Sequence, residues 1–162
     1  MYQLAIFDLD GTLLDTLADL RQGLNYALST QGFAPRTLPE VRAFVGNGIR
    51  KLIERAVPDY AVKTLSAQYF PGLLAASAGA KDGVRKKPCP DAVFEVVRQL
   101  GAEALRAVYI GDSEVDVATA RNAGLPCISV SWGFRDRDVL VNAGAETICD
   151  SMDALYRALR EG

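Results

Sequence analysis

Residues 4–12 read Leu-Ala-Ile-Phe-Asp-Leu-Asp-Gly-Thr, and they indicate both the fold and the chemistry of this chain. The apolar run Leu4–Phe7 is typical of a buried strand in a parallel sheet, which is covered on both faces. Asp8 and Asp10 follow at the carboxyl end of that strand, where open α/β sheets bind their ligands. Their like charges would repel, and Mg²⁺ with oxygen ligands would relieve the repulsion. We therefore predict a magnesium site here, the alternative being an acidic loop that caps the next helix.

The composition is that of one ordinary globular domain with a small appendage. The chain has 162 residues, of which 49% are hydrophobic, and its formal net charge is −2. Without a strong basic patch, nucleic acid is not an expected partner. Without an apolar run of about 18 residues, or room for a signal peptide before the first strand, no membrane association is expected. The three cysteines are widely spaced and odd in number, which predicts reduced thiols in a cytoplasmic protein.

The chain contains no histidine. This excludes a Ser-His-Asp or Cys-His mechanism and any histidine-ligated metal within the chain. Carboxylates combined with Mg²⁺ are therefore the leading option for catalysis.

The order of predicted elements indicates an α/β fold, a three-layer doubly wound parallel sheet, because strands alternate with helices. An all-helical block interrupts the alternation, and we interpret it as a reduced helical cap over the aspartate pair. We predict a core domain of residues 1–15 and 58–162 and a cap of residues 16–57. Further predicted strands are Leu73–Ala78, Ala107–Ile110, Cys127–Val130 and Thr147–Cys149, and predicted helices include 59–70 and one that starts at Pro90.

A second acidic cluster follows the predicted strand Ala107–Ile110. Asp112 lies at the carboxyl end of this strand, as Asp8 does in the first, so we favour a metal-binding role over a helix cap formed by Asp112 or Ser113. Asp116 lies one helical turn further on. It could support the metal site from behind or lie on a solvated helix face, and the sequence does not distinguish these alternatives.

A basic loop bounded by proline precedes the helix that starts at Pro90. Lys87 in this loop could neutralise the clustered carboxylates and hold a phosphate. Lys86 is an equal competitor by spacing alone.

Three motifs in this order resemble the haloacid dehalogenase-like phosphohydrolases, and within them the phosphoglycolate phosphatase type. The motifs are Asp8-Leu9-Asp10-Gly11-Thr12, Lys87-Pro88-x-Pro90 and Gly111-Asp112-Ser113-Glu114-Val115-Asp116, with further likeness at 44–48, 120–124 and 132–135. The resemblance implies a Mg²⁺-dependent phosphatase that acts on a small phosphorylated metabolite such as 2-phosphoglycolate.

The resemblance also implies a role for each site residue. Asp8 would be the nucleophile that forms an aspartyl-phosphate, and Asp10 would protonate the leaving alcohol and then activate water. Mg²⁺ would be held by Asp8, the backbone carbonyl of Asp10 and Asp112. Lys87 would be a third catalytic residue, which bridges Asp8 and the phosphoryl group. Phosphate would be bound by Leu9, Asp10 and Lys87. Supporting residues around this site would be Thr12, Ser113 and Asp116.

The chain departs from the family pattern in one place. The pattern has a second strand that ends in Ser or Thr, whose hydroxyl binds the phosphate, but Ala56–Tyr60 runs from the cap directly into the next helix. We predict that roughly thirty residues or more are missing, since one βαβ unit needs that many. Ser77 lies too close to Lys87 in the sequence to replace the hydroxyl. We therefore expect the magnesium site to persist and turnover to be weak or absent.

Other functions share parts of this pattern. A non-catalytic or regulatory protein of the same fold could bind Mg²⁺ or a phosphorylated ligand without turnover, and a phosphate-transferring mutase shares the core. A response-regulator receiver also clusters aspartates with a lysine, but the order of motifs and the helical insertion argue against it. Arg50 and Arg135 are candidate ligands for a substrate anion. The sequence does not predict the oligomeric state.

Overall fold

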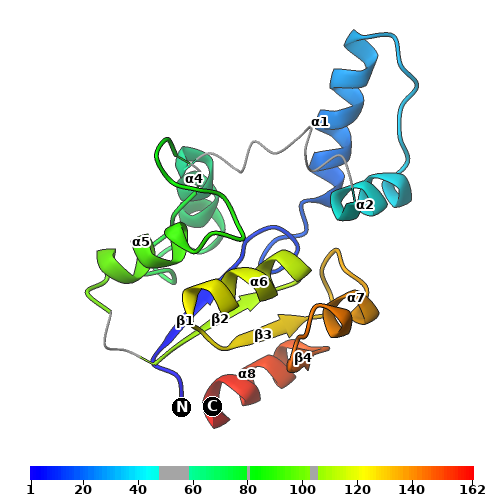
Figure 1. Cartoon of the computed structure of the whole chain (residues 1–162). Coiled ribbons are helices and arrows are strands. Elements are labelled where there is room, and N and C mark those ends of the chain that lie inside the picture. The colour runs from blue at the N-terminus through cyan, green and yellow to red at the C-terminus, as the bar shows by residue number, and fades with distance from the viewer. Residues whose placement is uncertain (48–58, 80, 103–105) are drawn as a thin grey trace.

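The computed structural model describes residues 1–47, 59–79, 81–102 and 106–162 of the chain. In these ranges four parallel strands form one sheet, and helices lie on both of its faces. This confirms the predicted α/β class (Figure 1). None of the helices in these ranges combines the length and apolar composition that a membrane span requires. The strands are β1 (Leu4–Phe7), β2 (Ala107–Gly111), β3 (Cys127–Val130) and β4 (Thr147–Cys149), and the helices are α1 (Leu17–Thr30), α2 (Leu38–Asn47), α4 (Asp59–Tyr69), α5 (Asp91–Gln99), α6 (Glu114–Ala123), α7 (Arg137–Asn142) and α8 (Met152–Glu161).

Side-chain alternation along the strands divides the core into two layers. On one face Val108, Ile110 and Val130 pack with Leu155 of α8. On the opposite face Ile6 and Tyr109 pack with α5 and α6, through Val93 and Ala120. Strand β2 is buried along its whole length, because it has a neighbouring strand on each side and helices over both faces.

Strand β1 is less buried than the sequence predicts. Only Ile6 of its four residues is fully buried. The strand order is β1-β2-β3-β4, so in the described part of the chain β1 is an edge strand that pairs with β2 alone. The N–H groups of Leu4 and Asp8 donate to carbonyls next to or within β2. Because the direction alternates along a strand, the N–H and C=O groups of Ala5 and Phe7 point to the open edge.

The predicted strand Leu73–Ala78 is wrong, since these residues form a turn followed by irregular chain. Alanine has a low strand propensity, and the run does not pair with any described strand. Between this run and β1 lies an apolar groove of about 670 Å³, which we call the β1 groove. It is lined by residues 4–10 on one side and by residues 73–79, 84–87 and parts of α5 on the other.

Helices α1 and α2 pack on each other and stand away from the sheet (Figure 1). The buried Val41 anchors α2, and Arg42 of α2 forms an ion pair of 3.2 Å with Asp136, which precedes α7. The last part of the predicted cap, residues 48–57, lies outside the described residues.

Candidate active site

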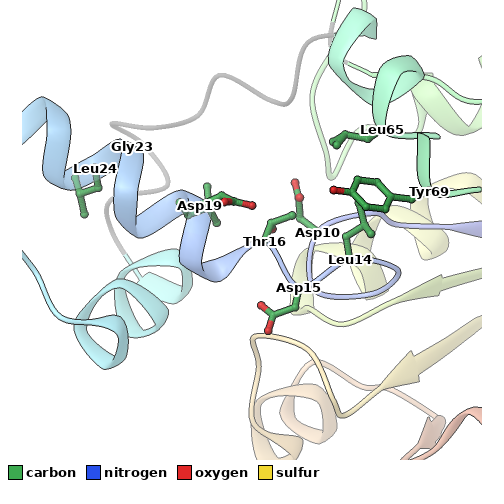
Figure 2. Close-up of a pocket in the computed structure, with 10 residues that line it drawn as sticks. Asp10, Leu14, Asp15, Thr16, Asp19, Gly23, Leu24, Leu65 and Tyr69 are labelled. Atoms are coloured by element: carbon green, nitrogen blue, oxygen red, sulfur yellow. The ribbon is translucent and has the colours of Figure 1, made fainter. Parts of the chain in front are cut away.

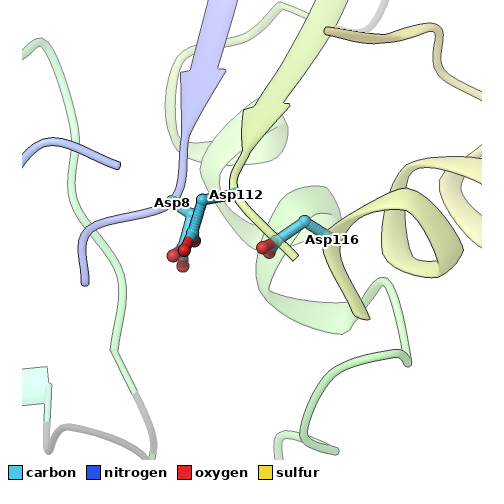
Figure 3. A group of neighbouring side chains, drawn as sticks. All are labelled: Asp8, Asp112 and Asp116. Atoms are coloured by element: carbon cyan, nitrogen blue, oxygen red, sulfur yellow. The ribbon is translucent and has the colours of Figure 1, made fainter. Parts of the chain in front are cut away.

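The carboxylates of Asp8, Asp112 and Asp116 converge at the carboxyl edge of the sheet. One oxygen of each lies within 4.8 Å of the others. Asp8 and Asp112 come from the ends of the neighbouring strands β1 and β2 and point the same way, and Asp116 points toward them from the first turn of α6 (Figure 3). The juxtaposition of Asp8 with Asp112 expected from their strand ends is therefore present.

Lys87 reaches into this cluster from the loop before α5. Its Nζ lies 2.5 Å from Asp8 Oδ1 and 2.7 Å from Asp116 Oδ1. Burial disfavours the ammonium, but the two carboxylates outweigh this effect and raise the pKa of Lys87 well above its usual value. Lys86, the alternative that the sequence left open, is exposed. The structure thus places Lys87 and not Lys86 at the aspartates.

The positive charge of Lys87 offsets only part of the cost of burying the Asp8 carboxylate. Burial raises its pKa from 3.8 to about 7, against the opposing effect of Lys87, and the negative charge of Asp116 adds to the rise. Further positive charge beside Asp8 would therefore favour its ionised form at neutral pH.

Two loops, the one after β1 and the one after β3, meet around Asp112 and hold it. Its side chain is buried, and its oxygens accept hydrogen bonds from the Phe134 N–H at 2.7 Å and the Thr12 hydroxyl at 3.3 Å. Gly11 and Gly133 lie against it so closely that a Cβ on either would meet Asp112 Oδ2, at 2.6 and 2.3 Å. Burial raises the pKa of Asp112. Among the described residues its direct hydrogen-bond donors are neutral, so a cation would stabilise its ionised form.

Asp116 lies behind the cluster and not on a solvated helix face. It is 2% exposed, and Ser113 caps α6 in a reciprocal arrangement with it. Ser113 donates its N–H and its hydroxyl to Asp116 Oδ2, at 3.1 and 2.5 Å. Oδ1 accepts from Lys87, so both oxygens of Asp116 have protein partners. Ser113 therefore does form the helix cap that the sequence offered as an alternative, and it also orients Asp116.

Asp10 lines the β1 groove together with Asp8 and also borders a second cleft. It lies with Asp15, Thr16 and Tyr69 around a cleft of about 500 Å³ between α1 and α4 (Figure 2). Burial raises the pKa of Asp10, with Thr16 and Lys87 opposing the rise. A carboxyl group that holds its proton more tightly is suited to donate it to a group in this cleft.

The remaining predicted residues lie in the loop after β1 or in loops at the same edge. The carbonyl of Leu9 accepts hydrogen bonds from the N–H groups of Leu13 and Leu14. Arg135 is buried and binds Glu114 through two hydrogen bonds of 2.5 and 2.8 Å, so its guanidinium is engaged within the protein. Arg50 lies outside the described residues.

Sequence reasoning assigned no role to two groups of this site. Phe134 supplies a backbone donor to Asp112, and the Gly-Phe pair that follows β3 is the signal that could have identified it. The buried phenol of Tyr109 donates to Asp116 Oδ1 at 3.3 Å. Tyr109 gives no such signal, because it lies within an apolar strand.

Comparisons with known proteins show what the chain is similar to. The profile of the family described as haloacid dehalogenase-like hydrolase matches residues 5–73 and 73–130. A phosphoglycolate phosphatase from Agrobacterium fabrum is 28% identical over 216 residues, which cover 98% of this chain and 92% of that protein. One from Mesorhizobium japonicum is 29% identical over 192 residues, which cover 83% of this chain and 85% of that protein.

Solved structures are similar over nearly the whole chain. A protein from Lactobacillus delbrueckii subsp. bulgaricus, assigned as a phosphoglycolate phosphatase, superposes with a TM-score of 0.88 at 29% identity and 98% coverage of each chain. A protein from Clostridium acetobutylicum has a TM-score of 0.84 at 21% identity, which supports the fold alone. The alignment of 216 residues exceeds the 162 residues of this chain, so the Agrobacterium relative contains residues that this chain lacks.

Proposed function

The chain belongs to the haloacid dehalogenase-like hydrolase family, and from this premise we propose that it is a phosphatase in which Asp8 takes the phosphoryl group of a small phosphomonoester and passes it to water. The observation that carries the proposal is the convergence of Asp8, Asp112 and Asp116 within 4.8 Å, with the Lys87 ammonium against two of them. Phosphoryl transfer requires positioned positive charge, of which Lys87 supplies part, and the three carboxylates could hold a cation that supplies the rest.

The residues of the cluster fit a divalent cation, and we propose Mg²⁺. Their ligand atoms are hard carboxylate oxygens, and the buried Asp112 takes its direct hydrogen bonds from neutral donors among the described residues. Asp8, Asp112 and the backbone carbonyl of Asp10 would hold the ion. When bound, it would neutralise charge on the phosphoryl oxygens and favour the ionised form of Asp8.

The first half of the reaction transfers the phosphoryl group to the protein. A carboxylate oxygen of Asp8 attacks phosphorus, the ester P–O bond breaks, and Lys87 balances the negative charge that Asp8 and the phosphoryl group share. Asp10 gives its proton to the departing alcohol oxygen, and the cleft beside Asp10 provides room for the alcohol.

The second half returns the site to its starting state. Asp10, now ionised, removes a proton from water, whose oxygen attacks the phosphorus of the aspartyl-phosphate. The bond between phosphorus and Asp8 breaks, inorganic phosphate leaves, and Asp10 is again protonated. This is the order of proton transfers that the raised pKa of Asp10 supports.

We propose that residues 16–57 form a reduced cap on a core of residues 1–15 and 58–162. The packing of α1 on α2, away from the sheet, supports this division. The substrate would be a small phosphorylated metabolite. 2-Phosphoglycolate is the first compound to test, because relatives over nearly the whole chain are named for it. The shortened chain and the open edge of β1 support our expectation that turnover is reduced relative to these relatives.

The test is steady-state hydrolysis of p-nitrophenyl phosphate and 2-phosphoglycolate by the full chain. Activity should require Mg²⁺, disappear with EDTA and disappear in Asp8→Asn. Hydroxylamine should convert the acyl-phosphate on Asp8 into a hydroxamate, which mass spectrometry of the digested protein would locate. Hydrolysis that persists in Asp8→Asn, or that is unaffected by EDTA, would refute the proposed mechanism.

One observation favours a second candidate, a protein that binds Mg²⁺ or a phosphorylated ligand without turnover. The β1 groove and the edge of β1 that is unpaired among the described residues lie where a sheet neighbour would complete the site. Calorimetry that shows Mg²⁺ binding to the wild type and not to Asp112→Asn, together with no hydrolysis of either substrate, would support this candidate over the enzyme.

A further inference from the structure

Tyr109 places a polar contact inside an apolar strand, directly behind the lysine of the site. Its side chain is 2% exposed, and its hydroxyl donates to Asp116 Oδ1 at 3.3 Å. The same oxygen accepts from Lys87 Nζ at 2.7 Å. Lys87 Nζ also lies 5.2 Å from the centroid of the Tyr109 ring, within the range of a cation–π contact.

We propose that Tyr109 is a positioning residue, which holds Asp116 and the Lys87 ammonium so that Lys87 faces Asp8 and the transferred phosphoryl group. This inference rests on the proposed function. A lysine side chain has a flexible four-carbon stem, and its ammonium group by itself has little preference for one direction of interaction. The ring restrains Lys87 from one side, and the hydroxyl fixes the carboxylate that restrains it from another.

A role as core filler does not explain this arrangement. The neighbouring residues of β2, Val108 and Ile110, are apolar and fully buried. An apolar side chain at position 109 would be buried without needing a hydrogen-bond partner. A buried hydroxyl is costly without a hydrogen bond, and here its partner is a carboxylate of the active site. Burial raises the pKa of Tyr109 well above its usual value, so the phenol remains a donor.

The chain offers a matched control in Tyr156 on α8. This tyrosine is 60% exposed, its hydroxyl accepts from Arg160 at 3.2 Å, and the Arg160 guanidinium lies 5.7 Å from its ring centroid. Tyr109→Phe and Tyr156→Phe therefore remove the same hydroxyl from similar tyrosine–cation pairs, one inside the site and one outside it.

The first measurement is steady-state hydrolysis of p-nitrophenyl phosphate with saturating Mg²⁺. Because a hydrogen bond to a charged acceptor corresponds to a factor of roughly ten or more, we expect Tyr109→Phe to lower kcat roughly tenfold. KM should change less than about twofold, since the phenol does not touch substrate, and Tyr156→Phe should match the wild type. A Tyr109→Phe enzyme with wild-type kcat, or a loss confined to KM, would overturn the inference.

A double-mutant cycle separates positioning through Asp116 from a general structural effect. If Tyr109 acts through Asp116, Tyr109→Phe should cost little further activity in an Asp116→Asn background. An equal loss of kcat in both backgrounds would show that the phenol does not act through this carboxylate.

A measurement without turnover keeps the inference separate from the proposed function. In protein labelled with ¹⁵N-lysine, the Lys87 ammonium should give a resolved NMR signal because its protons are held by carboxylates. The signal is assigned by its absence in Lys87→Arg. It should broaden or disappear in Tyr109→Phe and persist in Tyr156→Phe. A wild type that hydrolyses no phosphoester refutes the proposed function alone, whereas an unchanged Lys87 signal in Tyr109→Phe refutes the positioning role.

Discussion

Replacement of Asp8 by asparagine should stabilise the metal-free protein at pH 8. Burial raises the pKa of Asp8 from 3.8 to about 7 despite the contact with Lys87, so the folded state binds the Asp8 proton more tightly than the unfolded state does. The contribution of Asp8 to the free energy of unfolding is therefore most favourable below pH 3.8 and is lost as the pH rises toward 7. Above pH 7 the full penalty of the ionised carboxylate is present.

The penalty has an upper limit of ~4 kcal/mol, because a tenfold change in proton affinity corresponds to ~1.4 kcal/mol. The Asp8 side chain is 21% exposed, so solvent screens part of its charge. We expect Asp8→Asn to gain about 2 kcal/mol at pH 8, which is roughly 4–8 °C in Tm for a chain of this size. At pH 5 the gain should fall to less than half.

The assay is thermal unfolding followed by circular dichroism, in EDTA and in Mg²⁺, at both pH values. Mg²⁺ should stabilise the wild type and not the variant, because an ion that binds only the folded state raises the free energy of unfolding. Asp91→Asn is the matched control with the opposite sign, since its partner Arg85 lowers the pKa of Asp91, and its loss should destabilise the protein. A metal-free Asp8→Asn variant that unfolds at a lower temperature than the wild type at pH 8 would refute the reasoning.

Further predictions concern the surroundings of the site. Gly133→Ala would place a Cβ 2.3 Å from Asp112 Oδ2. Calorimetry should show Mg²⁺ binding weakened roughly tenfold or more, as loss of a contact that supports a metal ligand does. Gly23→Ala is the control and should bind Mg²⁺ like the wild type, because a Cβ at Gly23 would have no atom within 4 Å. Ser113→Ala should lower the free energy of unfolding by about 1 kcal/mol through loss of the α6 cap, and it should also lower kcat. Ser151→Ala, at the cap of α8, should lower the free energy of unfolding without changing kcat. Urea unfolding and activity assays compare the two variants, and equal kcat values would contradict the link between Ser113 and Asp116. The β1 groove should bind an apolar dye such as ANS at neutral pH, and a dye signal no higher than that of a phosphatase with a complete sheet would argue that the groove is closed in solution.

Much of the core could be predicted from local pattern. The apolar runs that became β2, β3 and β4, and the helices between them, follow from periodicity and from stop signals such as Gly124, which adopts φ 70° at the end of α6. The run Leu73–Ala78 was the failure. Its apolar character suggested a strand, but alanine has a low strand propensity, and among the described residues the β1 groove separates the run from the open edge of β1.

The sequence by itself determined the inventory of the site. Carboxylate chemistry was the leading option, because the chain has two acidic motifs after apolar strands, a lysine before a Pro-x-Pro turn and no histidine. Such features can be read from sequence, since residue type and strand position are local properties. Only the tertiary structure decided that Asp116 is buried beside Lys87, and that Tyr109 and Phe134 support Asp116 and Asp112. These contacts join loops distant in the chain, and their geometry depends on how the strands pack side by side, which no local pattern encodes.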